Sequence, residues 1–253
     1  MQPAHPSVFP SYDLGDIPAL SARQMQEVDR LMVQHYQIDL LQMMELAGRH
    51  LAHLARLLFL GGEPYGKTVL LLAGKGGNGG GAMACARRLA TWGAEVVVGV
   101  THPLDQLTPA AAHQRVILQQ MQTTIVAASA RATIRPPDLI IDGLIGYQLQ
   151  GAPRDDAAQW IRWANDQPVP LLALDLPSGL DATTGEAANP TIQATATMTL
   201  ALPKTGLVVG GINGIAGALY LADIGVPPTL YALASLGLAV PSLFAQSEII
   251  QLP

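Results

Sequence analysis

Hydrophobic positions follow a helical period in the first part of the chain. Apolar residues recur at helical spacing over residues 21–36 and again over residues 40–60, where Gly61 and Gly62 end the second pattern. Ser21 precedes the first stretch, and its hydroxyl can accept a hydrogen bond from the first helical turn. The pattern therefore predicts two helices ahead of the main body of the domain.

Short runs rich in leucine and β-branched residues come next, and helix-like segments at 80–92, 107–121 and 154–165 separate the earlier runs. Strands that alternate with helices imply right-handed crossovers and parallel pairing. The sequence predicts an α/β fold: a single doubly wound, mostly parallel, Rossmann-like sheet with helices on both faces and an N-terminal helical preface. The expected strands lie within 68–74, 94–102, 123–128, 138–146, 169–179, 194–203 and 217–227.

Two segments differ in their expected organisation. Residues 1–20 contain four prolines and lack the basic and then apolar pattern of a secretory signal, so we expect an extended arm that lies across a partner subunit. Residues 21–253 show no repeat or change of composition, and we expect one α/β domain there. The apolar stretch at 230–240 is shorter than the roughly 20 residues that cross a bilayer.

Composition narrows the class of protein. Charged residues make up 13% of the chain and hydrophobic residues 49%, which suits strands buried on both faces. The net charge of −5 argues against a nucleic-acid partner. Cys85 is the single cysteine, which excludes an internal disulfide and suggests a packed helix position in a reducing cytoplasm. We expect a soluble cytoplasmic protein with a small-molecule ligand and neither nucleic acid nor membrane as a partner.

Polar residues mark the edge of the sheet where ligands of such folds bind, beyond the carboxyl ends of the strands. Asp142 and Asp175 each end an apolar run, and Lys204 closes another. Ser178 lies in a turn without a G-x-S-x-G elbow, and this disfavours a serine hydrolase. A histidine pair within 50–53 can share a helix face, but a metal site is disfavoured because acidic or cysteine partners are not nearby.

A glycine-rich segment, AGKGGNGGGAMACARRL at 73–89, follows the first expected strand. Gly74, Gly76 and Gly79 satisfy the dinucleotide pattern G-x-G-x-x-G, but the second strand does not end in the acid that would hold a ribose, so a dehydrogenase is a weaker alternative. Lys75 comes too early for a phosphate-binding P-loop. The segment indicates backbone N–H groups that cradle an anion such as diphosphate, or else a tight strand-to-helix turn.

Five short motifs occur in an order that is typical of one known family. They are MELAG at 44–48, DGLIGYQLQG at 142–151, LDLPSGLDATTG at 174–185, LPKTG at 202–206 and DIGVP at 223–227. With them the chain resembles the YjeF N-terminal domain family, the NAD(P)H-hydrate epimerases, from about Leu20 to Pro227. Several signatures in order are far more specific than a lone glycine pattern.

The resemblance implies a reaction and a site. The reaction is the interconversion of the R and S hydrates of NADH and NADPH, with Asp175 and Lys204 as the groups that handle the proton. It also implies one potassium ion per subunit, held by Asn78, Asp142 and Ser178. The implied substrate-binding residues are Gly77, Asn78, Gly79, Gly80, Gly81, Gly146, Tyr147, Gln148, Leu149, Gly151 and Asp175.

The glycine-rich segment departs from the family, whose members usually read G-P-G-N-N-G-G-D-G. Gly77 replaces an asparagine and Gly81 replaces the acid. A catalytically silent module that binds a nucleotide or a protein is therefore the alternative to an active epimerase. The resemblance also implies a homodimer and a separate hydrate dehydratase in the same pathway, because few residues follow Pro227 and we expect the family's C-terminal kinase-like domain to be absent.

Overall fold

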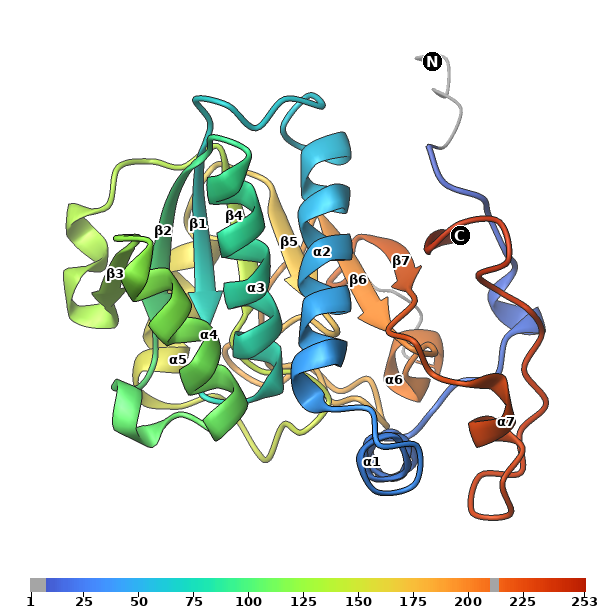
Figure 1. The fold of residues 1–253 in the computed structure, drawn as a ribbon. Coiled ribbons are helices and arrows are strands. Elements are labelled where there is room, and N and C mark those ends of the chain that lie inside the picture. The colour runs from blue at the N-terminus through green and yellow to red at the C-terminus, as the bar shows by residue number, and fades with distance from the viewer. Residues whose placement is uncertain (1–7, 210–213) are drawn as a thin grey trace.

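One twisted sheet forms the centre of the computed structural model, which describes residues 8–209 and 214–253 (Figure 1). Its eight described strands run in the order β3-β2-β1-β4-β5-β6-β7-β8, and all neighbours are parallel except β7 and β8. The predicted fold class and all seven predicted strands are confirmed. The strands are β1 (Thr68–Ala73), β2 (Glu95–Val100), β3 (Thr124–Ala127), β4 (Leu139–Gly143), β5 (Leu171–Leu174), β6 (Ala196–Leu200), β7 (Ala218–Ala222) and β8 (Ile249–Leu252).

The eighth strand was missed from the sequence. Strand β8 has only four residues and pairs antiparallel with β7 at the edge of the sheet. A run of four residues is too short to show a period, so only its pairing partner identifies it as a strand.

Helices cover both faces of the sheet. Figure 1 shows α2, α3 and α4 on one face, whereas Trp160 and Ile161 of α5 pack on the other face. Strand β1 contacts both helical layers. Leu71 belongs to the core cluster that includes α2, α3 and α4, and Leu72 belongs to the cluster that includes α5. The helices are α1 (Ala22–Gln34), α2 (Leu40–Leu58), α3 (Gly77–Thr91), α4 (Pro109–Gln120), α5 (Asp155–Asn165), α6 (Thr205–Val209) and α7 (Pro228–Tyr231), with short 3-10 turns at Leu14–Asp16, Leu104–Gln106 and Ala128–Thr133.

Helix α1 lies across the edge of the sheet toward which the arrowhead of β1 points in Figure 1. Ser21 is its N-cap, as predicted, and forms a capping box with Gln24. The chain just before it is tied to the end of β6, because the N–H of Leu20 donates to the carbonyl of Pro203 at 2.8 Å. These contacts fix α1 at the edge where ligands of such folds bind.

The described part of the N-terminal arm, residues 8–20, packs against this chain's own domain. Phe9, Ile17 and Leu20 are buried, and Ser11 forms a bridge to Gln251 of β8. The first seven residues of the predicted arm lie outside the described residues. Three apolar side chains of the arm therefore complete the core of the domain.

Helix α3 begins at Gly77, three residues before the predicted start at residue 80. Glycine costs roughly 1 kcal/mol relative to alanine inside a helix, so tertiary packing decides this boundary. A Cβ on Gly80 would lie 2.6 Å from the sulfur of Met44, and a Cβ on Gly48 would lie 2.6 Å from the Cβ of Ala84. Helices α2 and α3 therefore approach so closely that Gly48 has no room for a side chain, whereas a side chain at Gly80 would displace the flexible end of Met44.

Cys85 lies on the same helix and is fully buried with a free thiol. Burial raises the pKa of this thiol well above its usual range, so it is not a reactive group. The predicted packing role is confirmed. Among the described residues, we find no helix that combines the length and the apolar character needed to cross a membrane.

Candidate active site

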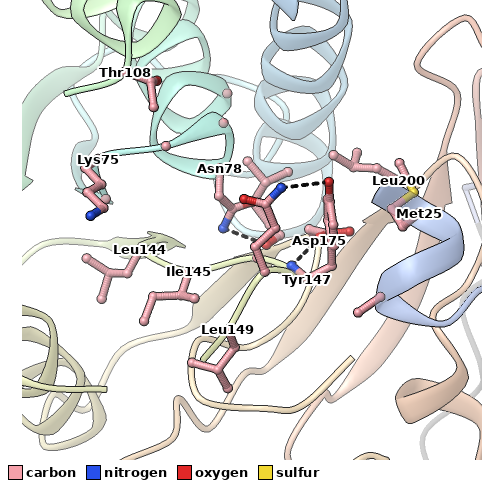
Figure 2. A pocket seen from close by; sticks show the side chains of 18 of the residues that line it. Met25, Lys75, Asn78, Thr108, Leu144, Ile145, Tyr147, Leu149, Asp175 and Leu200 are labelled. Atoms are coloured by element: carbon pink, nitrogen blue, oxygen red, sulfur yellow. Dashed lines mark hydrogen bonds between the residues drawn. The ribbon is translucent and has the colours of Figure 1, made fainter. Parts of the chain in front are cut away.

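A cleft of about 940 Å³ opens at the carboxyl edge of the sheet. Its walls come from α1, the start of α2, the turn between β1 and α3, the loop after β4, and the ends of β5 and β6. Figure 2 shows Asn78, Asp175 and Tyr147 close together in the middle of this cleft, with Lys75 and Thr108 at one end. The predicted ligand edge is therefore the edge that carries the cleft.

Asp175 occupies the floor of the cleft directly after β5 and is only 4% exposed. Its backbone has a φ of 67°, a left-handed conformation that is strained for a non-glycine residue. One carboxylate oxygen, Oδ1, lies 2.5 Å from the ammonium of Lys204. The other, Oδ2, accepts a hydrogen bond from the N–H of Tyr147 at 3.0 Å. Both oxygens are thus fixed by contacts from two different segments.

Lys204 lies behind Asp175 and is completely buried. Besides the ion pair, its ammonium donates to the carbonyl of Leu200 at 2.8 Å and to the hydroxyl of Thr199 at 3.3 Å. These contacts match the three donors of a lysine ammonium. Lys204 does not line the cleft, so its chemical role runs through the carboxylate of Asp175.

Asp142 ends β4 on the neighbouring strand and is also completely buried. Its partners are neutral: Ser178 donates to it from both its N–H and its hydroxyl, at 2.8 and 2.7 Å, and the N–H of Leu144 donates at 3.0 Å. Burial raises the pKa of the Asp142 carboxyl to about 6, although these hydrogen bonds oppose the shift. The described residues provide no ion pair for this acid within 4 Å.

The three predicted potassium ligands converge on the loop after β4 from three elements. Asp142 and Ser178 are in direct contact, and the Ser178 hydroxyl also contacts the backbone of Ile145. Asn78 lies on the other side of this loop, where its amide donates to the carbonyl of Leu174 at 3.2 Å. Its carbonyl oxygen lies close to Gly146, 3.2 Å from the position of an added Cβ. Carboxylate, amide and hydroxyl oxygens are suitable ligands for a hard cation.

Three of the predicted substrate-binding glycines line the cleft, and they differ in the space around them. Gly77 lines the cleft, and an added Cβ there would meet no atom within 4 Å, so open space surrounds the helix N-terminus. Gly81 also lines the cleft, but its Cβ would lie 3.0 Å from a methyl group of Leu174. Gly146 lies between Asp175 and Asn78, where a Cβ would come within 2.9 Å of a carboxylate oxygen. This last position needs glycine for a close approach.

Three predicted substrate-binding residues do not line the cleft. A Cβ on Gly79 would lie 1.9 Å from the carbonyl oxygen of Gly74, and Gly80 faces Met44 as described above. Gly79 is therefore needed for close packing against the backbone of Gly74, and Gly80 contacts the Met44 side chain of α2. Gly151 is exposed, and its φ of 69° makes it a turn residue. The remaining predicted residues, Gly77, Asn78, Gly81, Gly146, Tyr147, Gln148, Leu149 and Asp175, do line the cleft.

Asp29 is a cleft residue that the sequence reasoning missed. It lies on α1, and its Oδ2 accepts a hydrogen bond from the hydroxyl of Tyr147 at 2.5 Å. Burial raises the pKa of the Asp29 carboxyl; the hydrogen bond from Tyr147 and the charge of Lys204 oppose the shift. A lone acid on an amphipathic helix gives no sequence signal, because solvated helix faces carry such residues routinely.

His50 and His53 lie far from this edge, in a smaller cavity of about 330 Å³ that also contains Glu248 and three arginines. The His53 ring contacts the Arg56 guanidinium, and His50 lies 3.9 Å from a carboxylate oxygen of Glu248. No group of three His, Cys, Asp or Glu side chains suited to a metal occurs in the described part of the chain.

The chain is similar to several known proteins whose names refer to NAD(P)H-hydrate. NAD(P)H-hydrate epimerase of Dehalogenimonas lykanthroporepellens is 40% identical over 84% of each chain. NAD(P)H-hydrate epimerase of Rhodopirellula baltica is 32% identical, covering 83% of this chain and 86% of that protein. The bifunctional NAD(P)H-hydrate repair enzyme Nnr of Salinibacter ruber is 36% identical over 83% of this chain, which spans only 41% of that larger protein.

Structure and family comparisons agree with these relatives. The crystal structure of the yeast protein YNL200c superposes with a TM-score of 0.79, at 22% identity, and covers 93% of this chain and 100% of that one. This likeness establishes the fold. The family model described as YjeF-related protein N-terminus matches residues 40–206, which include both buried acids and Lys204. The chain therefore belongs to the family of YjeF-related protein N-termini.

Proposed function

We propose that this protein is an NAD(P)H-hydrate epimerase, which interconverts the R and S hydrates of NADH and NADPH. The observation that carries this proposal is the carboxylate of Asp175, held by Lys204 and by the Tyr147 N–H at the floor of the cleft. Relatives named as epimerases over more than four-fifths of their length support it.

The cleft suits a dinucleotide. Its volume of about 940 Å³ lies at the upper end of the range for small-molecule sites. The N-terminus of α3 borders it at Gly76 and Gly77, where backbone N–H groups and the helix dipole attract an anion. A diphosphate at this helix end would leave the hydrated nicotinamide ring free to reach toward Asp175.

The reaction requires a group that moves a proton at the hydrated carbon, C6 of the ring. That carbon bears a hydroxyl next to the ring nitrogen, so the nitrogen lone pair can expel the hydroxyl when an acid protonates it. Water then returns to either face of the planar ring. Asp175 would exchange the proton with the hydroxyl oxygen, and Lys204 would supply the counter-charge that keeps the carboxylate fixed. Opening and closure of the ring would use the same groups.

We further propose that Asn78, Asp142 and Ser178 hold one potassium ion per subunit. Their oxygens, with the nearby carbonyl of Ile145, form the hard donor set that such an ion prefers. A fully buried carboxylate with neutral partners supports the proposal, because an uncompensated buried charge is costly. When bound, the ion would supply positive charge beside the loop that carries Gly146.

A silent binding module is the second candidate function. The open space beside Gly77 favours it, because the asparagine side chain usual in the family is missing at a position that lines the cleft. Such a module would bind a nicotinamide or adenine nucleotide without turnover. Titration calorimetry with NADP⁺ would show binding in either case, whereas only the epimerase would also change the hydrate.

The setting of the reaction is also a proposal. We propose that a hydrate dehydratase consumes the product, and bifunctional NAD(P)H-hydrate repair enzymes among the relatives, such as Nnr of Salinibacter ruber, support this functional link. We also propose a homodimer. We propose the cytoplasm as its compartment, because a single buried thiol is suited to a reducing environment.

The decisive experiment incubates the protein with pure R-hydrate and follows the S form by chromatography. We expect the S form to appear well above the spontaneous rate with the native chain and at the spontaneous rate with an Asp175→Asn variant. Spontaneous rates for both proteins, in potassium buffer and with bound nucleotide confirmed by calorimetry, would reject the epimerase and leave the silent module.

A further inference from the structure

Tyr147 joins two acids of the cleft that belong to different layers of the molecule. Its backbone N–H donates to Oδ2 of Asp175 at 3.0 Å, and its hydroxyl donates to Oδ2 of Asp29 at 2.5 Å. The amide of Gln148 donates to the same hydroxyl at 3.0 Å. One residue therefore links helix α1 to the carboxylate at the floor of the cleft.

Asp29, which accepts the hydrogen bond from the Tyr147 hydroxyl, lies on a well-packed part of α1. Val28 and Met32, one residue before and three residues after Asp29 on α1, are completely buried in the core. The start of α1 is tied to the segment of Lys204 by the bridge between Leu20 and Lys204. Asp29 therefore sits at a fixed position relative to Lys204, and the charge of that lysine is close enough to act on its carboxyl.

The hydrogen bond between Asp29 and Tyr147 lies in a poorly hydrated place. Burial raises the pKa of the Tyr147 hydroxyl, and the neighbouring charge of Asp29 raises it further. The phenol therefore stays protonated and serves as a donor over the physiological range. A hydrogen bond to a carboxylate is stronger than one between neutral groups, and low local polarity increases its strength.

The loop after β4 changes from buried to exposed near Tyr147. Its first residues are restrained by a hydrogen bond, which the N–H of Ile145 donates to the hydroxyl of Ser178. From Gln148 onward the loop is largely exposed, and Gly151 lies outside the cleft wall. Tyr147 lies between the hydrogen-bonded first part of the loop and its exposed second part. The hydrogen bond from its hydroxyl to Asp29, here called the tether, restrains the residue whose N–H donates to Asp175.

We infer that Asp29 is a positioning residue, which acts through Tyr147 to fix the loop 144–151 and to aim the carboxylate of Asp175 at the substrate. This inference rests on the proposed epimerase activity, because Asp175 is the group that it positions.

Misplacement of a reacting group by about 1 Å can cost on the order of 100-fold in rate. We therefore expect Tyr147→Phe, which removes only the hydroxyl, to lower kcat about 10-fold and to change KM less than about threefold. Asp29→Ala should give a similar loss, and Asp29→Asn a smaller one, because its amide oxygen still accepts the hydrogen bond. The double variant Asp29→Ala/Tyr147→Phe should be no worse than Tyr147→Phe alone.

Tyr36→Phe is the matched control. It also removes a tyrosine hydroxyl that forms a hydrogen bond, at 2.8 Å to the Thr229 hydroxyl, and it lies at the far end of the same helix region outside the cleft. This variant should keep the native kcat. An unchanged kcat in Tyr147→Phe, or fully additive losses in the double variant, would overturn the inference.

Hydrogen exchange separates this inference from the proposed activity. Peptides that cover residues 144–151 should exchange faster in Tyr147→Phe and in Asp29→Ala than in the native chain or in Tyr36→Phe. If the native chain does not convert the R-hydrate, the proposed epimerase fails, while faster exchange in the two variants still supports the tether. Unchanged exchange in both variants would refute the tether whatever the activity.

Discussion

Two buried carboxylates end neighbouring strands of the sheet, and the molecule compensates their charges differently. Asp175, after β5, forms an ion pair with the completely buried ammonium of Lys204. Asp142, at the end of β4, has three hydrogen bonds from neutral donors, two of them from Ser178. The first also borders the cleft, whereas the second is sealed beneath it.

The difference indicates different tasks for the same residue type. A carboxylate with a built-in counter-charge is held in one position beside a substrate. A carboxylate with neutral donors keeps an uncompensated charge, and burial raises the pKa of Asp142 to about 6. Such a site gains free energy when a cation from solution joins it. The following experiments change one acid at a time, or its partners, in order to separate these tasks.

The largest effect should follow removal of the buried cation. Lys204→Met leaves the charge of Asp175 unpaired in the interior, which costs roughly 3–5 kcal/mol of folding free energy and should abolish epimerase activity. Urea unfolding measures the first and the R-hydrate assay the second. Lys67→Met is the control, because this partly exposed lysine should contribute about 0.5 kcal/mol at most.

A double variant tests whether the charge itself is responsible. Asp175→Asn combined with Lys204→Met removes both charges and should recover most of the lost stability, because an apolar replacement of an entire buried pair is often neutral. Activity should stay absent. A double variant as unstable as Lys204→Met alone would show that packing of the lysine stem, and not the unpaired acid, dominates.

Removal of the cleft acid alone should affect both rate and stability. Asp175→Asn keeps the shape of the side chain and an acceptor for the Tyr147 N–H, but it leaves the buried ammonium of Lys204 without a counter-charge. Urea unfolding should therefore show a loss of stability, and the rate is compared under conditions where the variant is folded. The lost proton exchange should slow epimerisation about 10² to 10⁴-fold. Asp181→Asn, in the turn that follows, is the control and should keep the native rate. An unchanged rate in Asp175→Asn would exclude this acid from the chemistry.

On the side of Asp142, Ser178→Ala should cost roughly 1–3 kcal/mol in urea unfolding, because a buried carboxylate and the N–H of Ile145 each lose a partner. Thr197→Val, which removes a buried hydroxyl hydrogen-bonded to the carbonyl of Ala216, is the matched control. Both variants should lose stability, but only Ser178→Ala should also weaken the response to potassium. Equal potassium responses in the two would separate Ser178 from the ion.

The smallest effect should be that of the ion. Potassium at about ten times its dissociation constant should stabilise the native chain by about 1.4 kcal/mol relative to lithium, visible as a higher Tm in calorimetry. Asp142→Asn should remove this difference, because it removes the charge that the ion would balance. Identical Tm values for the native chain in potassium and lithium would contradict the proposed site and leave Asp142 compensated by hydrogen bonds alone.

Sequence patterns by themselves determined the architecture and the ligand edge. Long apolar runs between helical segments can be satisfied only by buried parallel strands, and parallel strands bring all their carboxyl ends to one edge. This is why Asp142, Asp175 and Lys204 could be assigned to one region before any coordinates. The short edge strand β8 was not predicted, because four residues are too few to show the alternation of a strand.

Tertiary structure alone decided the roles within that edge. The sequence placed Lys204 at the same edge as Asp175 without showing that the lysine lies wholly behind it. It also treated all the glycines at 77–81 as ligand contacts, although Gly79 packs against the backbone of Gly74 and Gly80 contacts Met44 of α2. Asp29 was invisible because its partner, Tyr147, is 118 positions away in the chain. Local patterns encode periodicity and turns, whereas the partners of a side chain depend on distances that exist only after the layers have packed.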